Sequence, residues 1–251
     1  MMKMMTVHVS CRVSRGVQKA ECEDSCLVGT AVINDSAVSL DSTAPTMVCL
    51  CDGVGGNAGG RDASLFICRE IGKALDHPEV AETLKNLNRE LIEYGIQSGK
   101  PTMASTLTGL IFRDDRITLI HAGNTRLYTI RGGFLNQITT DHTTYEWLKS
   151  IGNTEAAEAC NRSEIRCAFG AGNPDYLKQL VVRPVFDDRR PKLLMMTTDG
   201  IHDYLTNDEM ESILCTESTD SEIIDSLIES AGEKGSKDDR SAVLIRIKEI
   251  E

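Results

Sequence analysis

The chain has 251 residues, of which 41% are hydrophobic and 26% charged, and its formal net charge is -11. This length suffices for one large core without a second domain, and the excess of acids argues against nucleic acid as the main partner. No apolar stretch approaches the roughly 20 residues that a membrane-spanning helix needs. The N-terminus, MMKMMTVHVSCR, has no signal-peptide pattern. We therefore expect a cytoplasmic protein with one domain, 1–251, and no membrane partner.

The cysteines argue against a secreted, disulfide-linked protein. There are nine, an odd number in a chain without a secretory signal. Cys22, Cys26, Cys49 and Cys51 are spaced poorly for a zinc knuckle, and the last two share one face of a predicted strand. We interpret all four as small buried hydrophobic residues.

The sequence pattern of the N-terminal half predicts strands followed by helices. Alternation predicts a strand over 6–16, and the apolar run CLVGTAVI predicts a second over 26–33. The polar stretch 34–45 is expected to be a hairpin loop. Apolar residues at helical spacing predict helices over 62–75 and 78–94.

The C-terminal half predicts four short strands, an insertion, and a final set of strand, two helices and strand. The four runs between 105 and 139 predict an antiparallel meander, with Gly132-Gly133 as its strongest hairpin signal. Residues 141–190 lack a clear period beyond a helix at 144–151, so we interpret them as a variable surface insertion. Helices are expected over 206–215 and 220–231. This order predicts an α+β fold with helices on the faces of antiparallel sheets.

The most informative stretch is MVCLCDGVGGNAGG, residues 47–60. Its apolar run ends at Asp52, and the glycines at 53, 55 and 56 allow the backbone to approach a ligand closely. A carboxylate on a rigid strand end beside such a loop suits a hard cation such as Mg²⁺ or Mn²⁺. By itself, however, an Asp-Gly pair more often forms a type I′ turn.

Three further acidic clusters favour the metal hypothesis. PKLLMMTTDGIHD, residues 191–203, repeats the pattern of apolar run, Asp-Gly and a later acid; KAECEDS and GSKDDRS contribute the other two clusters. Carboxylates buried together without cations would repel one another and raise one another's pKa. The sequence therefore predicts a shared metal site at the tips of several strands.

These motifs resemble those of the PPM-type metal-dependent protein serine/threonine phosphatases, the protein phosphatase 2C-like family, and its compact bacterial members in particular. Six stretches occur in the family's order and spacing and cover nearly the whole chain: KAECEDS, VCLCDGVGGNAGGRDAS, MASTLTGLIF, ITLIHAGNTRLYTIRGGFLNQITTDHT, LLMMTTDGIHDYL and GSKDDRSAVLIRI. The resemblance implies a four-layer α/β-β/α sandwich, in which two stacked antiparallel sheets are flanked by helix pairs. It also implies a metal cluster at one end.

The resemblance further implies hydrolysis of phosphoserine and phosphothreonine by a water that bridges two Mn²⁺ or Mg²⁺ ions. Asp52 would bridge the two ions, and Gly53 would offer its carbonyl oxygen to one of them. The remaining implied ligands are Asp199 and Asp238 at the first ion, with Glu23 and its supporting neighbour Asp24 at the second.

Two departures from the family concern phosphate capture and proton donation. Lys19 stands where the family has an arginine that grips the substrate phosphate. Lysine supplies a point charge but no bidentate fork, so we expect weaker capture. Val54 stands where some members have a histidine thought to act as general acid, and valine cannot take that role.

A third departure concerns a third ion. The family's acid in a GDSR-like turn is replaced by Asn124, a neutral oxygen ligand. We expect a third ion to be held less tightly, mainly by Asp199 and Asp203.

Two functional hypotheses follow. The retained acids favour an active protein phosphatase, whereas Lys19 and Asn124 favour a weakly active or inactive phosphatase-like module that binds phosphoproteins. Either hypothesis implies a phosphorylated protein partner and a serine/threonine kinase counterpart, and we expect a monomer. In relatives the 141–190 segment forms a flap beside the active site, and we expect it to set substrate choice.

Overall fold

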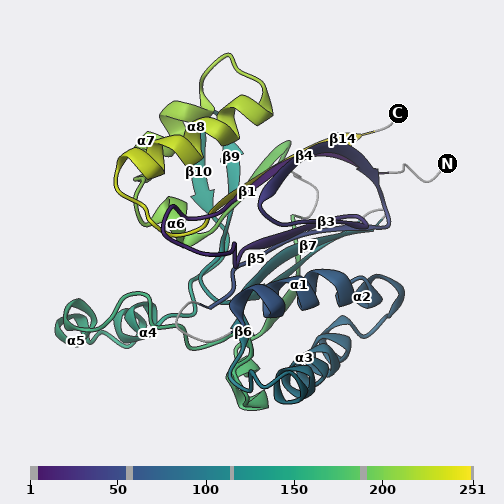
Figure 1. The fold of residues 1–251 in the computed structure, drawn as a ribbon. Coiled ribbons are helices and arrows are strands. Elements are labelled where there is room, and N and C mark those ends of the chain that lie inside the picture. The colour runs from purple at the N-terminus through teal and green to yellow at the C-terminus, as the bar shows by residue number, and fades with distance from the viewer. Residues whose placement is uncertain (1–4, 55–58, 114–115, 187–190, 250–251) are drawn as a thin grey trace.

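The computed structural model describes residues 5–54, 59–113, 116–186 and 191–249. The glycines at 55 and 56 and the predicted turn at 114–115 lie outside these ranges. Two six-stranded antiparallel sheets form the centre of the molecule, and helices cover their outer faces (Figure 1). This is the predicted α+β sandwich.

The first sheet has the strand order β10-β9-β13-β14-β1-β4. Its long central pair, β1 and β14, runs antiparallel from Met5 opposite Glu249 to Ser14 opposite Arg240. The strands of this sheet are β1 (Met5–Ser14), β4 (Ser36–Thr43), β9 (Arg126–Arg131), β10 (Phe134–Gln137), β13 (Leu193–Thr197) and β14 (Arg240–Glu249).

The second sheet has the order β12-β8-β7-β5-β2-β3, and a small sheet pairs β11 with β6. All six residues of β5 are buried, as its apolar sequence predicts. The strands are β2 (Ser25–Val28), β3 (Ala31–Ile33), β5 (Thr46–Cys51), β6 (Ala104–Ser105), β7 (Leu107–Arg113), β8 (Arg116–Ala122), β11 (Phe169–Gly170) and β12 (Val181–Val185).

In Figure 1, α1, α2 and α3 lie on one outer face, α6, α7 and α8 lie on the other, and α4 and α5 protrude from the molecule. The helices that follow Thr206 and Thr219 begin with capping boxes to Glu209 and Glu222. The helices are α1 (Gly60–Glu70), α2 (Lys73–Asp76), α3 (Val80–Gln97), α4 (Thr144–Ser150), α5 (Thr154–Ala159), the 3₁₀ helix η1 (Pro174–Leu177), α6 (Asp199–His202), α7 (Asn207–Leu214) and α8 (Asp220–Glu233).

Three apolar clusters hold these layers together. One lies between the two sheets and includes Val9 and Leu50. The second packs α1 and α3 against the β5 sheet, with Ile67 and Leu84 in its centre. The third packs α7 and α8 against the β14 sheet through residues such as Leu227. Alternate residues of a strand therefore face different clusters, which fixes the register of the sheets.

The predicted meander is wrong in its connectivity. The four strands form, but β7 pairs with β8 in one sheet, while β9 pairs with β10 and β13 in the other. The chain crosses between the sheets at Gly123 and Asn124. Alternation identifies strands but not hydrogen-bonding partners, so the pattern could not distinguish a crossover from a hairpin. The predicted hairpin at Gly132-Gly133 is confirmed.

Two other sequence interpretations need correction. Residues 34–45 are not simply a loop, because β4 occupies most of them as an edge strand with alternating exposure. The range 141–190 is more regular than the single predicted helix implies. Its strand β12 joins the β5 sheet, where it pairs with β8. None of the helices in the described ranges is long and apolar enough to cross a membrane.

Candidate metal centre

Asp52 lies directly after β5, as the apolar run predicts. Its backbone is fixed on both sides by the segment that leads into β7. Its N–H donates to the Thr106 hydroxyl at 3.1 Å, and its carbonyl accepts from the Ser105 hydroxyl at 3.0 Å and from the Thr106 N–H at 2.8 Å. The carboxylate therefore projects from a rigid backbone, as a metal ligand requires.

Gly53 is required by a close approach of two backbones. A Cβ at this position would lie 2.4 Å from the Gly60 carbonyl, so any other residue would displace the start of α1. The Gly53 N–H donates to the Glu23 carbonyl at 3.1 Å. This contact joins the β5 end to the acidic segment that precedes β2.

Asp24 is buried and held by hydroxyl groups from the opposite sheet. Its carboxylate accepts from Thr198 at 3.0 Å and from Ser241 at 2.6 Å. Burial, followed by the charges of Asp239 and Asp199, raises its pKa. Asp24 thus connects the 23–24 segment to the ends of β13 and β14.

Asp199 and Asn124 meet at the first turn of α6. The Asn124 side-chain amide donates to the Asp199 carboxylate at 3.0 Å. Burial, together with the charges of Asp238 and Asp203, raises the pKa of Asp199 to about 6. The Asn124 side-chain oxygen is buried and has no hydrogen-bond partner, so its lone pairs are free.

Lys19 lies among the acidic groups. Its ammonium is 2.9 Å from Glu23, 2.5 Å from Asp238 and 3.1 Å from Asp239. Burial by itself lowers the pKa of Lys19, but the hydrogen bonds to Asp238 and Glu23 outweigh it. The pKa therefore lies above its ordinary value, and the side chain is fully charged. The predicted phosphate-binding position and the predicted metal ligands therefore occupy one site.

Asp239 is a component of this site that the sequence analysis did not single out. It is buried, and its carboxylate accepts from the backbone N–H groups of Gly16 at 2.8 Å and Glu23 at 2.7 Å. It fixes the segment that carries both Lys19 and Glu23. Its position beside Asp238 was visible in the sequence, but its separate role depends on contacts across more than 200 residues.

The electrostatics of the site fit a cation. Burial, followed by repulsion from Asp199, Asp24 and Asp238, raises the pKa of Asp52. The four acidic clusters come together as predicted, yet not in a tight group. Among the residues described, only three cysteines form a set of three or more His, Cys, Asp or Glu ligand atoms within 4.8 Å of one another. Three of the acids, Glu23, Asp238 and Asp239, instead pair with the Lys19 ammonium.

Asp203 lies on the side of the site that faces the 141–190 segment. Together with Asn124 it lines a cavity of about 270 Å³, whose other walls come from Arg126, Asp141 and the α4 region. Arg126 forms a bidentate pair with Asp141, donating from Nε to Oδ1 and from Nη2 to Oδ2. The structure therefore brings Asn124 and Asp203 to one cavity, beside Asp199.

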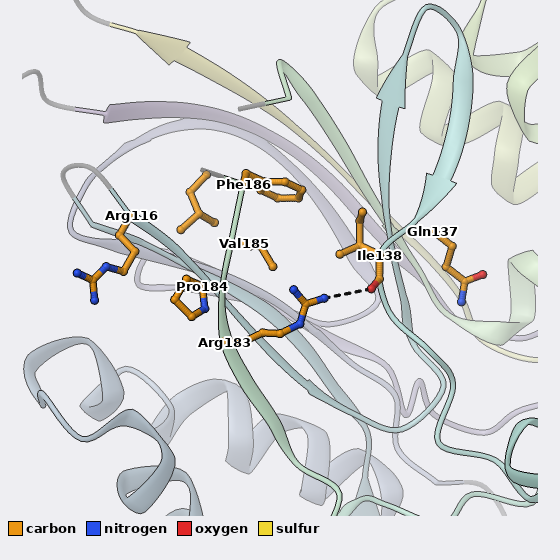
Figure 2. Close-up of a pocket in the computed structure, with 8 residues that line it drawn as sticks. Arg116, Gln137, Ile138, Arg183, Pro184, Val185 and Phe186 are labelled. Atoms are coloured by element: carbon orange, nitrogen blue, oxygen red, sulfur yellow. Dashed lines mark hydrogen bonds between the residues drawn. The ribbon is translucent and has the colours of Figure 1, made fainter. Parts of the chain in front are cut away.

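Another cavity lies away from this site. It has a volume of about 550 Å³ and is shown in Figure 2, where Arg183 of β12 donates to the Ile138 carbonyl at 3.5 Å. None of the predicted site residues lines it. Its lining residues are Arg116, Ile117, Gln137, Ile138, Arg183, Pro184, Val185 and Phe186.

Comparisons with known proteins found related sequences and similar folds. No family model matches the chain. The serine/threonine phosphatase Stp of Listeria monocytogenes is 25% identical over 214 residues, which is 79% of this chain and 83% of that protein. The solved serine/threonine phosphatase of S. agalactiae aligns with a TM-score of 0.78 at 20% identity, over 96% of this chain and 100% of the other.

A third relative has been solved with metal. The catalytic domain of the protein phosphatase PstP, in complex with two manganese ions, aligns with a TM-score of 0.72 at 23% identity, over 97% of this chain and 99% of the other. The chain is thus a relative of the bacterial PPM-type phosphatases, with the same fold. The names of its relatives support its assignment as an enzyme of the serine/threonine phosphatase class.

Proposed function

We propose that the chain hydrolyses phosphoserine and phosphothreonine in proteins with two Mn²⁺ or Mg²⁺ ions. The observation that carries this proposal is the convergence of carboxylates from four distant segments at the ends of strands from both sheets, where Asp199, Asp24 and Asp238 repel Asp52. Lys19 pairs with Glu23 and Asp238 in the same site. Burial, followed by repulsion among the carboxylates, raises the pKa of Asp52 and Asp199, and divalent cations would relieve that repulsion.

The proposed ligands are Asp52, the Gly53 carbonyl, Asp199, Asp238 and Glu23, with Asp203 and the Asn124 oxygen available to a third ion. When bound, the ions supply a readily deprotonated water and neutralise charge on the phosphoryl oxygens.

The chain's own contribution is to orient these groups. The Ser105 and Thr106 contacts hold Asp52 in place, and the Thr198 and Ser241 hydroxyls hold Asp24. Lys19 presents a fixed positive charge to the incoming phosphoryl group. Because it also pairs with three carboxylates, part of this charge is already compensated.

The decisive experiment is hydrolysis of para-nitrophenyl phosphate and of a phosphothreonine peptide by EDTA-stripped protein, titrated with Mn²⁺ and Mg²⁺. We expect activity to appear with metal and to fall on the order of 1,000-fold in Asp52→Asn. The matched control is Asp225→Asn, which removes an exposed carboxylate that pairs with Arg12 outside the site. A folded protein that binds two metal ions but hydrolyses neither substrate would contradict the proposal.

Two observations favour the second candidate, a weakly active or inactive module that binds phosphoproteins. Lys19 is bound by carboxylates instead of standing free, and Asn124 offers Asp199 an amide donor where the family has an acid. Asn124→Asp tests the second feature. A faster rate at high Mn²⁺ would mean that the third site limits activity, and an unchanged rate would mean that it is irrelevant here.

The remaining parts of the proposal concern context. A phosphorylated protein is the substrate, a serine/threonine kinase supplies the phosphate, and the protein acts as a cytoplasmic monomer of one domain. The 141–190 segment selects the substrate, since α4 and the residues after it line the cavity beside Asn124 and Asp203. Exchange of 144–163 for the same segment of a relative should change the preferred phosphopeptide without abolishing hydrolysis of para-nitrophenyl phosphate.

A further inference from the structure

Three cysteine side chains meet behind the end of β5. Cys49 and Cys51 come from β5 and Cys68 from α1, and their sulfur atoms all lie within 4.8 Å of one another. The Cys51 and Cys68 sulfurs are 3.7 Å apart. All three side chains are buried, with at most 1% of their surface exposed. The distance between the sulfurs of Cys51 and Cys68 is too long for a disulfide, so these are free thiols in contact.

The fold explains why these three meet and other cysteines do not. Alternation along β5 directs Cys49 and Cys51 to the same face, the one covered by α1. Figure 1 shows α1 lying along this sheet. Cys11 and Cys26 belong to the cluster between the two sheets, on the opposite face. The group is therefore limited to three sulfurs, with no further His, Cys, Asp or Glu ligand atom of the described residues inside it.

Three sulfurs at this spacing match the demands of a soft ion. An ion that bonds thiolate at about 2.3 Å holds three sulfurs about 4 Å apart. Structural zinc sites almost always use four ligands, whereas cuprous ion is satisfied by two or three thiolates. The absence of a fourth ligand among the described His, Cys, Asp and Glu side chains thus favours Cu⁺ over Zn²⁺.

We propose that Cys49, Cys51 and Cys68 form a binding site for one cuprous ion. Each thiol that binds passes its proton to the solvent, and no electron is transferred because the ion arrives as Cu⁺. The site is distinct from the acidic centre, which has only oxygen ligands. It is nevertheless coupled to that centre through the backbone, since Cys51 immediately precedes Asp52.

Burial determines how the ion enters. No sulfur of the three reaches the surface, so loading requires α1 to move away from β5 or occurs while the chain folds. The experiment therefore loads the protein in two ways: as the folded, reduced chain, and during refolding from denaturant. In both cases Cu⁺ is supplied without oxygen, in competition with a chromophoric chelator such as bicinchoninate.

We expect one Cu⁺ per chain to resist the chelator in at least one of the two preparations, with three sulfur neighbours by X-ray absorption. Cys68→Ser should weaken the affinity at least tenfold. The control variant Cys160→Ser/Cys215→Ser removes the two cysteines that are not buried and should bind as the parent does.

Three outcomes would overturn the proposal: no retained copper in either preparation, unchanged affinity in Cys68→Ser, or loss of binding in the control variant. If Cys68→Ser fails to fold, the sulfur count in the unmodified chain decides. Three sulfur neighbours support the site, and two sulfur neighbours, or any nitrogen or oxygen neighbour, exclude it. Copper binding is measured here independently of phosphatase activity.

Discussion

The two clusters of ligand atoms at the end of β5 differ in their effect on the free energy of unfolding. The acidic side chains lie close enough to raise the pKa of Asp52, after burial, by repulsion, and Asp238 pairs with the Lys19 ammonium. The three cysteines are neutral thiols that pack as hydrophobic residues in the core beneath α1. A metal-free acidic cluster is therefore under electrostatic stress, whereas a metal-free cysteine cluster is not. Substitutions in the two places should have opposite effects on stability.

The largest effect is expected from Asp52→Asn. Removing one carboxylate from the acidic cluster should lower kcat/KM with Mn²⁺ on the order of 1,000-fold, because the groups that stabilise transition-state charge would be disrupted. In EDTA the same change should raise the free energy of unfolding by about 1 kcal/mol, because repulsion with Asp199 and Asp24 is reduced. Steady-state kinetics and urea unfolding measure the two effects. A variant that is inactive and also less stable in EDTA would contradict the comparison.

The second effect concerns pH in the metal-free protein. The folded-state pKa of Asp199, about 6, lies above its ordinary value of about 3.9. The folded state therefore binds more protons between these values, and stability falls as the pH rises through this window.

Asp199→Asn removes that dependence. We compare the free energy of unfolding of the variant with that of the parent, measured with urea in EDTA. The difference in favour of the variant should grow by about 2 kcal/mol from pH 4.5 to pH 7. If the free energies of unfolding of both proteins change with pH in the same way, Asp199 ionises as easily in the folded as in the unfolded state, and the prediction is wrong. Asp225→Asn is again the control, because that carboxylate is exposed.

The third effect tests phosphate capture. Lys19→Arg restores a planar fork that can contact two phosphoryl oxygens, so kcat/KM for a phosphothreonine peptide should rise about tenfold, mostly through KM. Lys248→Arg makes the same exchange at an exposed pair with Asp41 and should change nothing. A fall in kcat/KM for Lys19→Arg would mean that the ammonium is needed in its present place among the acids.

The smallest effect comes from the cysteine cluster. Cys68→Ala removes a fully buried sulfur and should lower the free energy of unfolding by about 1 kcal/mol, because the space is only partly refilled. Cys215→Ala, at an exposed position, should have no measurable effect. Stabilisation by Cys68→Ala would show that the thiols are strained instead of packed.

Local patterns were sufficient to predict most of the strands and helices. The apolar run of β5 stops at Asp52 in the structure as it does in the sequence, and the caps at Thr206 and Thr219 begin α7 and α8. These features depend on near neighbours, whose preferences are written in the residues themselves. The separation of β7–β8 from β9–β10 was missed because either partner satisfies the same alternation.

The sequence by itself determined the chemistry of the acidic centre: carboxylates after apolar runs, and glycine where two backbones approach. Only the tertiary structure decided which groups share a site. In the folded chain Lys19 pairs with Asp238, and Asp239 accepts a hydrogen bond from the Glu23 backbone. Cys68 lies beside Cys49 and Cys51. The physical reason is that sheet pairing and helix docking set these distances across 17 to more than 200 residues, a range that no local pattern encodes.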